Sequence, residues 1–230
     1  MLRGVAVGVG GVVLTPVDGG ETWKMADPCS GTMVSDTAFL SEKSIVIAGY
    51  DGCVSRSEDA GKTWTRVNIF SRADLLTITF ADASNGSMTD SNGMVLLTGD
   101  GGWSWLPFNV RTNPKLVSVS YADRFTGWAV GENGLILRTD DGGFSWQRLS
   151  EGGREDVNDL AFLNDDIGVA VGPRCRGWPP YHRGLAWLPG FPPSVVSLRA
   201  SFFLHRRNAR VRGVHAITQR TSPRWLTWGR

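Results

Sequence analysis

Four copies of one short motif recur along the chain at a fixed interval of 41 residues, with no insertion or deletion between them. Each copy places an aspartate, a glycine and a tryptophan at the same relative positions. These residues are Asp18, Gly20, Trp23, Asp59, Gly61, Trp64, Asp100, Gly102, Trp105, Asp141, Gly143 and Trp146. A strict period of this length indicates a repeat protein in which every period folds as one supersecondary unit.

Each period contains enough β-type sequence for four short strands. Three apolar runs precede the motif, as at residues 116–122, 128–131 and 134–137, and a fourth run starts at the motif tryptophan. Gly, Asn and Asp separate the runs. Four strands in roughly 40 to 50 residues are typical of a propeller blade. We therefore predict an all-β propeller with a partial blade at 1–32, blades at 33–73, 74–114 and 115–155, and a half blade at 156–172.

The motif has a mechanical explanation that requires no ligand. Its aspartate can accept hydrogen bonds from backbone N–H groups of the turn, and its glycine can adopt the positive φ of a tight hairpin. A hydroxyl residue precedes the aspartate by two positions in three copies, whereas Pro16 stands there in the first. The tryptophan can place a large ring between neighbouring blades. We therefore interpret all twelve motif residues as structural rather than catalytic.

The motif resembles the Asp box of sialidases, some glucanases and sorting-receptor propellers. The longer segment from Gly127 to Trp146 is similar, more specifically, to the photosystem II assembly factor family of Ycf48/Hcf136-like proteins. The resemblance covers residues 4–172 and implies a non-enzymatic, seven-bladed Asp-box β-propeller in the thylakoid lumen or periplasm. It also implies a protein partner, a subunit of a membrane complex or its precursor. A carbohydrate-active Asp-box propeller, sialidase-like or a glycoside hydrolase, is the alternative.

The sequence departs from that family pattern at both ends. It starts inside a blade and carries only four boxes, so we expect a fragment of a larger propeller of about seven blades. Exposed blade edges lead us to expect a poorly soluble or oligomeric chain. The chain shows no secretory signal and no apolar run long enough to span a membrane, so the compartment is undetermined without the resemblance.

Charge separates the last 58 residues from the rest of the chain. Residues 1–172 carry 13 Lys and Arg against 22 Asp and Glu, a net charge of −9, while residues 173–230 carry 11 Arg and no Lys, Asp or Glu. Three interpretations stay open for this Arg-, Pro- and Trp-rich tail. It is an out-of-frame or disordered translation product, a basic extension that binds nucleic acid or anionic lipid, or a degenerate closing blade. Nucleic acid is expected as a partner only if the tail is genuine.

Residues 1–172 contain no recognisable catalytic constellation. Sialidase-type sites combine an arginine cluster, a nucleophilic tyrosine and an acid, yet only Tyr50 and Tyr121 are available, and no arginine motif accompanies them. The acidic pairs at 155–156 and 165–166 fall in expected loops, as solvated turn acids do. We therefore predict no catalytic residue.

Cofactor and metal sites are also not expected. The glycines at 8–11 lie between β segments with no helix start to hold a phosphate, and the segment at 140–142 lacks the alternating ligands of a calcium loop. Cys175 and His182 lack a second pair of ligands. Three cysteines are too few for a disulfide scaffold, which leaves the redox compartment undecided.

Four arginines give a weak indication of a binding surface. Arg56 and Arg138 occupy one repeat position just before the box hydroxyl, and Arg66 and Arg148 share another just after the tryptophan. Alternate blades could present these guanidinium groups at matching heights to an acidic peptide. Solvated strand-end charges explain the same pattern, and the sequence assigns no binding site to them.

Overall fold

The computed structural model describes residues 4–18, 20–108, 110, 115–149, 156–162, 167–171 and 184–187, and most regular elements in them are short β-strands. These strands form five separate sheets in chain order, called here the first to the fifth sheet. No helix in the described part of the chain is long and apolar enough to cross a bilayer.

The second, third and fourth sheets each contain four antiparallel strands in sequence order. The second consists of β4 (Val34–Phe39), β5 (Ile45–Gly49), β6 (Cys53–Ser57) and β7 (Thr65–Val67). The third consists of β8 (Leu75–Phe80), β9 (Gly86–Asp90), β10 (Val95–Thr98) and β11 (Leu106–Phe108). The fourth consists of β12 (Leu116–Tyr121), β13 (Gly127–Gly131), β14 (Ile136–Thr139) and β15 (Gln147–Arg148).

The first and fifth sheets contain three strands each. The first consists of β1 (Ala6–Val7), β2 (Val13–Pro16) and β3 (Trp23–Ala26), with a short 3-10 turn at Val9–Gly11 between the first two. The fifth consists of β16 (Asp159–Phe162), β17 (Ile167–Val171) and β18 (Gly184–Trp187). β18 runs parallel to β17, unlike the third strand of every other sheet. Apart from β18, the Arg-rich tail and its three interpretations lie outside the described residues.

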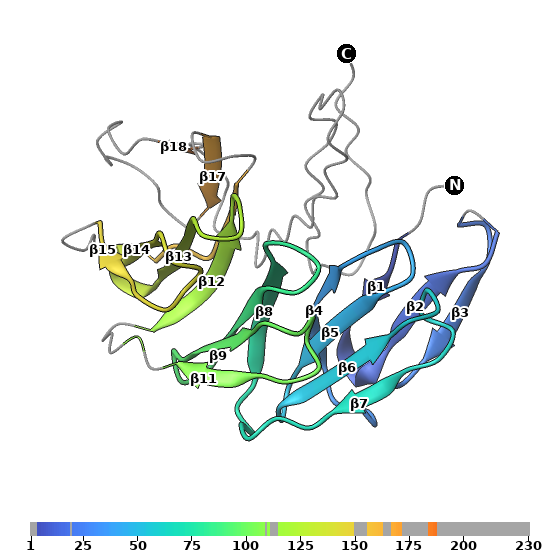
Figure 1. Ribbon diagram of the computed structural model, residues 1–230. Helices are drawn as coiled ribbons and strands as arrows, with labels where there is room; N and C mark the ends of the chain where they lie inside the picture. The colour runs from blue at the N-terminus through green and yellow to red at the C-terminus, as the bar shows by residue number, and fades with distance from the viewer. Residues whose placement is uncertain are drawn as a thin grey trace, which may run out of the picture.

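The sheets are arranged as propeller blades. The first strands of consecutive sheets, β4, β8, β12 and β16, contact one another, while the fourth strands β7, β11 and β15 lie at the outside (Figure 1). The predicted all-β fold with four-stranded Asp-box blades is therefore confirmed.

A bulge at one repeat position ties the first strands together. The register shifts between Val34 and Asp36 in β4, and β8 and β12 shift at the equivalent places. The Asp36 carboxylate accepts a hydrogen bond at 3.0 Å from the backbone N–H of Ile78 in the next sheet. Ser118 likewise donates to Asp159 of the following sheet at 2.7 Å. Polar bonds between sheets thus accompany the apolar packing near the centre.

The hydrophobic core is divided into clusters that lie between neighbouring sheets. One cluster joins Val46 and Val54 of the second sheet to Leu75, Met88 and Leu96 of the third. Equivalent clusters join the other neighbouring pairs of sheets. Every residue of the second strands β5, β9 and β13 is buried, because these strands have a neighbouring sheet on both faces.

The box tryptophan fills the space between its own sheet and the preceding one. Trp105 is only 3% exposed and packs in the cluster of the second and third sheets, with Phe80 edge-on at a centroid distance of 5.9 Å. Trp64 contacts the cluster between the first and second sheets, and Trp146 contacts the cluster between the third and fourth sheets. Trp23, in the first sheet, is 46% exposed. Burial of this ring therefore depends on a covering sheet.

We predict that Trp105→Ala lowers the free energy of unfolding by ~3–5 kcal/mol, because it removes a buried ring and leaves a cavity between two sheets. Urea denaturation followed by circular dichroism would measure the change. Leu106→Ala is the matched control, since its side chain is 70% exposed and its neighbour in sequence is the buried tryptophan. Equal losses in the two variants would contradict packing between sheets as the role of Trp105.

Candidate functional site

The aspartate of every box holds the turn that follows it. In the second box Asp59 Oδ1 accepts the backbone N–H of Thr63 at 2.8 Å, and Oδ2 accepts the Thr63 hydroxyl at 2.7 Å. The aspartates of the other three boxes bond the residue four positions later in the same two ways. Both carboxylate oxygens are thus engaged within the box.

The hydroxyl residue and the glycine complete the turn. The Thr98 hydroxyl donates to Asp100 at 2.8 Å and accepts the backbone N–H of Gly102 at 2.9 Å. Gly102 has a φ of 88°, and a Cβ there would lie 3.3 Å from both Phe80 and Val46. Its carbonyl accepts the indole N–H of Trp105 at 3.1 Å. Glycine is required because the backbone is left-handed and closely packed.

These hydrogen bonds keep the box carboxylates ionised. The hydroxyl and backbone N–H of Thr63 lower the pKa of Asp59 to about 2. Burial raises the pKa of Asp100, but the bonds from Ser104 and Thr98 outweigh it and lower the value to about 2. A general acid needs a raised pKa, so these two carboxylates are unsuited to donate a proton near neutral pH.

Each complete box also contacts the turn between the first two strands of its own sheet. The backbone N–H of Gly101 bonds the carbonyl of Ser84, and that of Gly142 bonds the carbonyl of Phe125, both at 2.8 Å. Boxes and these turns therefore form one edge of each sheet, called here the box edge. The opposite edge carries the turns between second and third strands and the connections between sheets.

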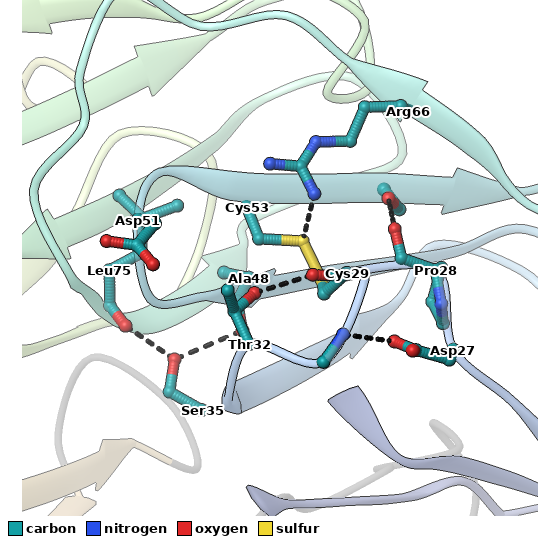
Figure 2. Close-up of a disulfide and its surroundings, with 12 residues drawn as sticks. Asp27, Pro28, Cys29, Thr32, Ser35, Ala48, Asp51, Cys53, Arg66 and Leu75 are labelled. Carbon is teal, nitrogen blue, oxygen red and sulfur yellow. Dashed lines mark hydrogen bonds between the residues drawn. A yellow bond between two sulfur atoms is a disulfide. The ribbon is translucent and has the colours of Figure 1, made fainter. Parts of the chain in front are cut away.

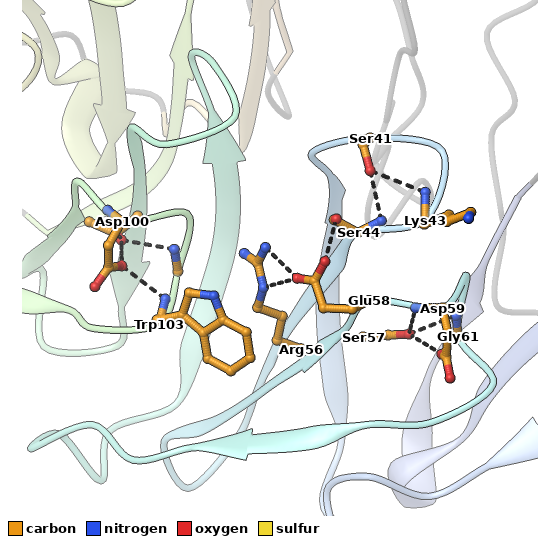
Figure 3. A network of polar contacts seen from close by, with 12 residues as sticks. Ser41, Lys43, Ser44, Arg56, Ser57, Glu58, Asp59, Gly61, Asp100 and Trp103 are labelled. Atoms are coloured by element: carbon orange, nitrogen blue, oxygen red, sulfur yellow. Dashed lines mark hydrogen bonds and ion pairs between the residues drawn. The ribbon is translucent and has the colours of Figure 1, made fainter.

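Arg56 joins the box edges of the second and third sheets (Figure 3). Its guanidinium forms an ion pair with Glu58, which also accepts a 2.7 Å bond from Ser44. The same guanidinium lies 4.9 Å from the ring centroid of Trp103 in the next box. Its Nη1 is buried and has no hydrogen-bond partner among the described residues.

The other three arginines of the sequence pattern differ in their surroundings. Arg138 bonds Asp140 at 2.7 and 2.9 Å, as Arg56 pairs with Glu58, but it lies over Trp128 of its own sheet and not over a residue of the next box. Arg66 donates to the sulfur of Cys53 at 2.8 Å, and Arg148 is exposed on β15. Arg56 and Arg138 are thus engaged by neighbouring side chains, which limits their availability to a peptide.

Three exposed aromatic side chains lie on the box edge of the third and fourth sheets. Trp103 is 47% exposed, Phe125 53% and Phe144 68%, and we call them the aromatic patch. The exposed Arg124 lies over Phe125 at 4.7 Å. Sequence analysis missed this feature, although Trp103 and Phe144 are 41 residues apart at the variable box position that Glu21 and Lys62 occupy elsewhere.

The two tyrosines in the described part of the chain, Tyr50 and Tyr121, differ in burial and hydrogen bonding. Tyr121 donates to the carbonyl of Gly142 at 3.2 Å, and burial raises its pKa to about 12, opposite to the activation that nucleophilic attack requires. Tyr50 is 36% exposed in the turn between β5 and β6. Asp156 accepts the backbone N–H of Asn133 at 2.8 Å.

Most of the other residues considered from the sequence as catalytic acids or metal ligands fall outside the described part of the chain. Glu155, Asp165, Asp166, Cys175 and His182 lie outside the described residues. Residues 8–11 form the turn between β1 and β2. Among the described residues no group of three or more His, Cys, Asp or Glu side chains could hold a metal ion.

A disulfide between Cys29 and Cys53 was not predicted from the sequence. Their Cα atoms are 5.8 Å apart, and the two residues are 24 positions apart in the chain. Neither cysteine recurs at the repeat interval, so the 41-residue pattern gave no indication of the pairing.

Comparison with known proteins supports the family resemblance. The family model described as photosynthesis system II assembly factor YCF48 matches residues 67–154. A solved structure of YCF48 bound to D1 peptide is 19% identical, with a TM-score of 0.55 over 70% of this chain. YCF48 from Cyanidioschyzon merolae is 23% identical, with a TM-score of 0.56 over 72%. The chain spans 53% and 58% of these two structures, a little over half their length.

Other propellers share the fold at lower identity. An ancestral GH74 enzyme is 15% identical, with a TM-score of 0.58 over 76% of this chain and 29% of its own. No curated protein matches the sequence. The predicted resemblance to the Ycf48 family is confirmed by the family model and by the two solved YCF48 structures, which share the propeller fold.

We predict that the conformational stability falls as the pH is lowered from about 4 to 2. The folded pKa of Asp59 and Asp100 is about 2, below the ordinary value of 3.8. A group with a depressed folded pKa contributes its full stability above the unfolded pKa and loses it as the pH falls through the folded one. Urea midpoints measured across this pH range would show the decrease.

Asp100→Asn tests which group is responsible. The substitution should lower the free energy of unfolding at pH 7 by about 1–2 kcal/mol, a figure reduced because the carboxylate is exposed to solvent. It should also make the fall in stability between pH 4 and 2 shallower. Glu21 is an exposed acid at the variable position of the first box, and Glu21→Gln should leave both the stability at pH 7 and its pH dependence unchanged. Parallel pH profiles for Asp100→Asn and the wild type would contradict the assignment.

Proposed function

We propose that this Ycf48-like β-propeller is a non-enzymatic binding protein that engages a peptide segment of a membrane-complex subunit through the aromatic patch. Photosystem II is the complex that the family resemblance suggests, and the related YCF48 structure bound to D1 peptide supports a protein partner. The single observation that carries the proposal is the exposure of Trp103, Phe125 and Phe144 on the box edge.

The chemistry of the patch suits a peptide with apolar and acidic side chains. Aromatic rings and arginine are enriched at the energetic centres of protein interfaces, where they combine large contact area with oriented polar groups. The guanidinium of the exposed Arg124 borders Phe125, and that of Arg56 lies over Trp103. Arg56 already has Glu58 as a partner, so Arg124 is the better candidate to meet a carboxylate from the peptide.

The environment of the acidic side chains supports the non-enzymatic part of the proposal. The box carboxylates bond their own turns, with the pKa of Asp59 and Asp100 lowered, while the pKa of Tyr121 is raised. Hydrolysis of a glycoside needs an acid with a raised pKa beside a second carboxylate or another nucleophile. The GH74 likeness extends to the fold alone, and no observation on the described residues favours the carbohydrate-active alternative.

The disulfide supports a compartment outside the cytosol. Disulfides persist in oxidising compartments such as the periplasm and are rare in the cytosol of mesophiles. Cys29 and Cys53 are 2% and 0% exposed, so the bond lies inside the fold. We therefore place the protein in the thylakoid lumen or the periplasm as part of this proposal.

We predict that the full chain binds a fluorescein-labelled synthetic D1 peptide and that Trp103→Ala weakens binding about 30-fold. Loss of an exposed anchor ring at the centre of an interface typically costs about 2 kcal/mol, which corresponds to that factor. Fluorescence anisotropy titration would give the dissociation constants, with Phe144→Ala as a second variant.

Phe70→Ala is the matched control because Phe70 is 96% exposed but lies on the opposite edge, in the connection from β7 to β8. It should bind as the wild type does. Equal weakening by all three variants would exclude the aromatic patch as the binding surface, and absence of binding would overturn the proposed partner. Turnover of a glycoside or sialoside, abolished by substitution of an acidic residue, would overturn the non-enzymatic assignment.

A further inference from the structure

The Cys29–Cys53 disulfide fastens the connection between the first and second sheets to the middle of the second sheet (Figure 2). Cys29 lies in the segment that joins β3 to β4, and Cys53 is the first residue of β6. Both side chains are buried in the cluster between the two sheets, beside Val13, Val34 and Ile47. The bond therefore ties the connection after the first sheet to a strand of the second sheet, in addition to the direct contacts of β1 and the 3-10 turn with β4.

Noncovalent contacts of this segment are mostly local. Asp27 accepts the backbone N–H of Gly31 at 3.0 Å, and Thr32 donates to the carbonyl of Cys29 at 2.8 Å, so both bonds stay within the turn. The carbonyl of Pro28 accepts a 3.2 Å bond from Ser55 of β6. The disulfide is thus the strongest link between the turn and β6.

The two sulfur atoms have different surroundings. Cys53 Sγ accepts a hydrogen bond at 2.8 Å from Nη1 of Arg66, whose side chain is exposed at the surface (Figure 2). A guanidinium beside a cysteine stabilises its thiolate and lowers its pKa when the bond is open. Cys29 lies in a turn instead of a strand, so a local opening of the turn exposes its sulfur without breaking the sheet.

We propose that the Cys29–Cys53 disulfide is a reducible clamp on the first sheet, opened by attack at Cys29 Sγ with Arg66 stabilising the Cys53 thiolate as it leaves. The reductant is a dithiol. Its thiolate bonds to Cys29 Sγ, and the electron pair of the broken S–S bond passes to Cys53. The second thiol of the reductant then displaces the Cys29 thiolate and forms the reductant's own disulfide. Two electrons and two protons reach the protein, which ends with two thiols.

Release of the clamp should loosen the first sheet and leave the others unchanged. The connection that contains Cys29 lies directly between β3 of the first sheet and β4 of the second, so its release acts first on the junction of these two sheets. This inference concerns a different part of the molecule from the aromatic patch and does not depend on the proposed partner.

The rate of reduction tests the role of Arg66. The oxidised full chain is treated with excess dithiothreitol, quenched with iodoacetamide at intervals and analysed by mass spectrometry. Arg66→Gln should slow reduction by roughly 3- to 10-fold because the leaving thiolate loses its stabilising charge, and Arg66→Lys should restore part of the rate. Arg148→Gln is the matched control, since Arg148 occupies the same repeat position two sheets away. An unchanged or faster rate in Arg66→Gln would overturn the role of Arg66.

The site of attack and the response of the fold are separate tests. Brief treatment with glutathione, followed by peptide mapping, should find the mixed disulfide on Cys29, and a mixed disulfide on Cys53 would overturn the proposed direction. After reduction, hydrogen exchange should accelerate across residues 5–34, while residues 75–148 keep their protection. Unchanged exchange in residues 5–34, or equal acceleration everywhere, would overturn the assignment of the disulfide as a clamp on the first sheet.

Discussion

The fold depends on the burial of each sheet between its two neighbours. A four-stranded sheet with apolar side chains on both faces cannot be covered by its own residues, and the second strands β5, β9 and β13 are buried at every position only because a sheet lies on either side. The core is therefore a series of clusters between sheets, and Trp64, Trp105 and Trp146 each contact the cluster shared with the sheet before theirs.

The Asp box separates a constant mechanical role from a variable surface. Its aspartate, glycine and hydroxyl residue satisfy one another and the turn, which leaves the carboxylate ionised and engaged within the box. The box bonds described above involve no side chain at the position after the glycine, which is Glu21, Lys62, Trp103 or Phe144 in the four copies. Because the turn does not depend on this side chain, each copy can present a different group to a partner. The aromatic patch is made possible by that independence.

The parts of the structure that the sequence predicted are those that recur every 41 residues. Strand number, the box turn and the fold class follow from local pattern and turn chemistry, which repetition makes visible. The bond from Asp36 to Ile78, the stacking of Arg56 on Trp103 and the Cys29–Cys53 disulfide depend on how one sheet is placed against the next. No local pattern encodes that placement. The parallel pairing of β18 with β17 was also unpredictable, since the repeat loses its motif before β18.

The position of the disulfide follows from the same constraint that shapes the core. Neighbouring sheets pack through clusters of buried side chains, and Cys29 and Cys53 belong to the cluster between the first and second sheets, together with Val13, Val34 and Ile47. The covalent bond crosses from the connection after β3 to β6, so it restricts a segment that lies outside the strands. A cross-link of this kind stabilises the fold chiefly by limiting the freedom of the unfolded chain. Under our proposal, the oxidation state of Cys29 and Cys53 therefore acts on the junction between the first and second sheets.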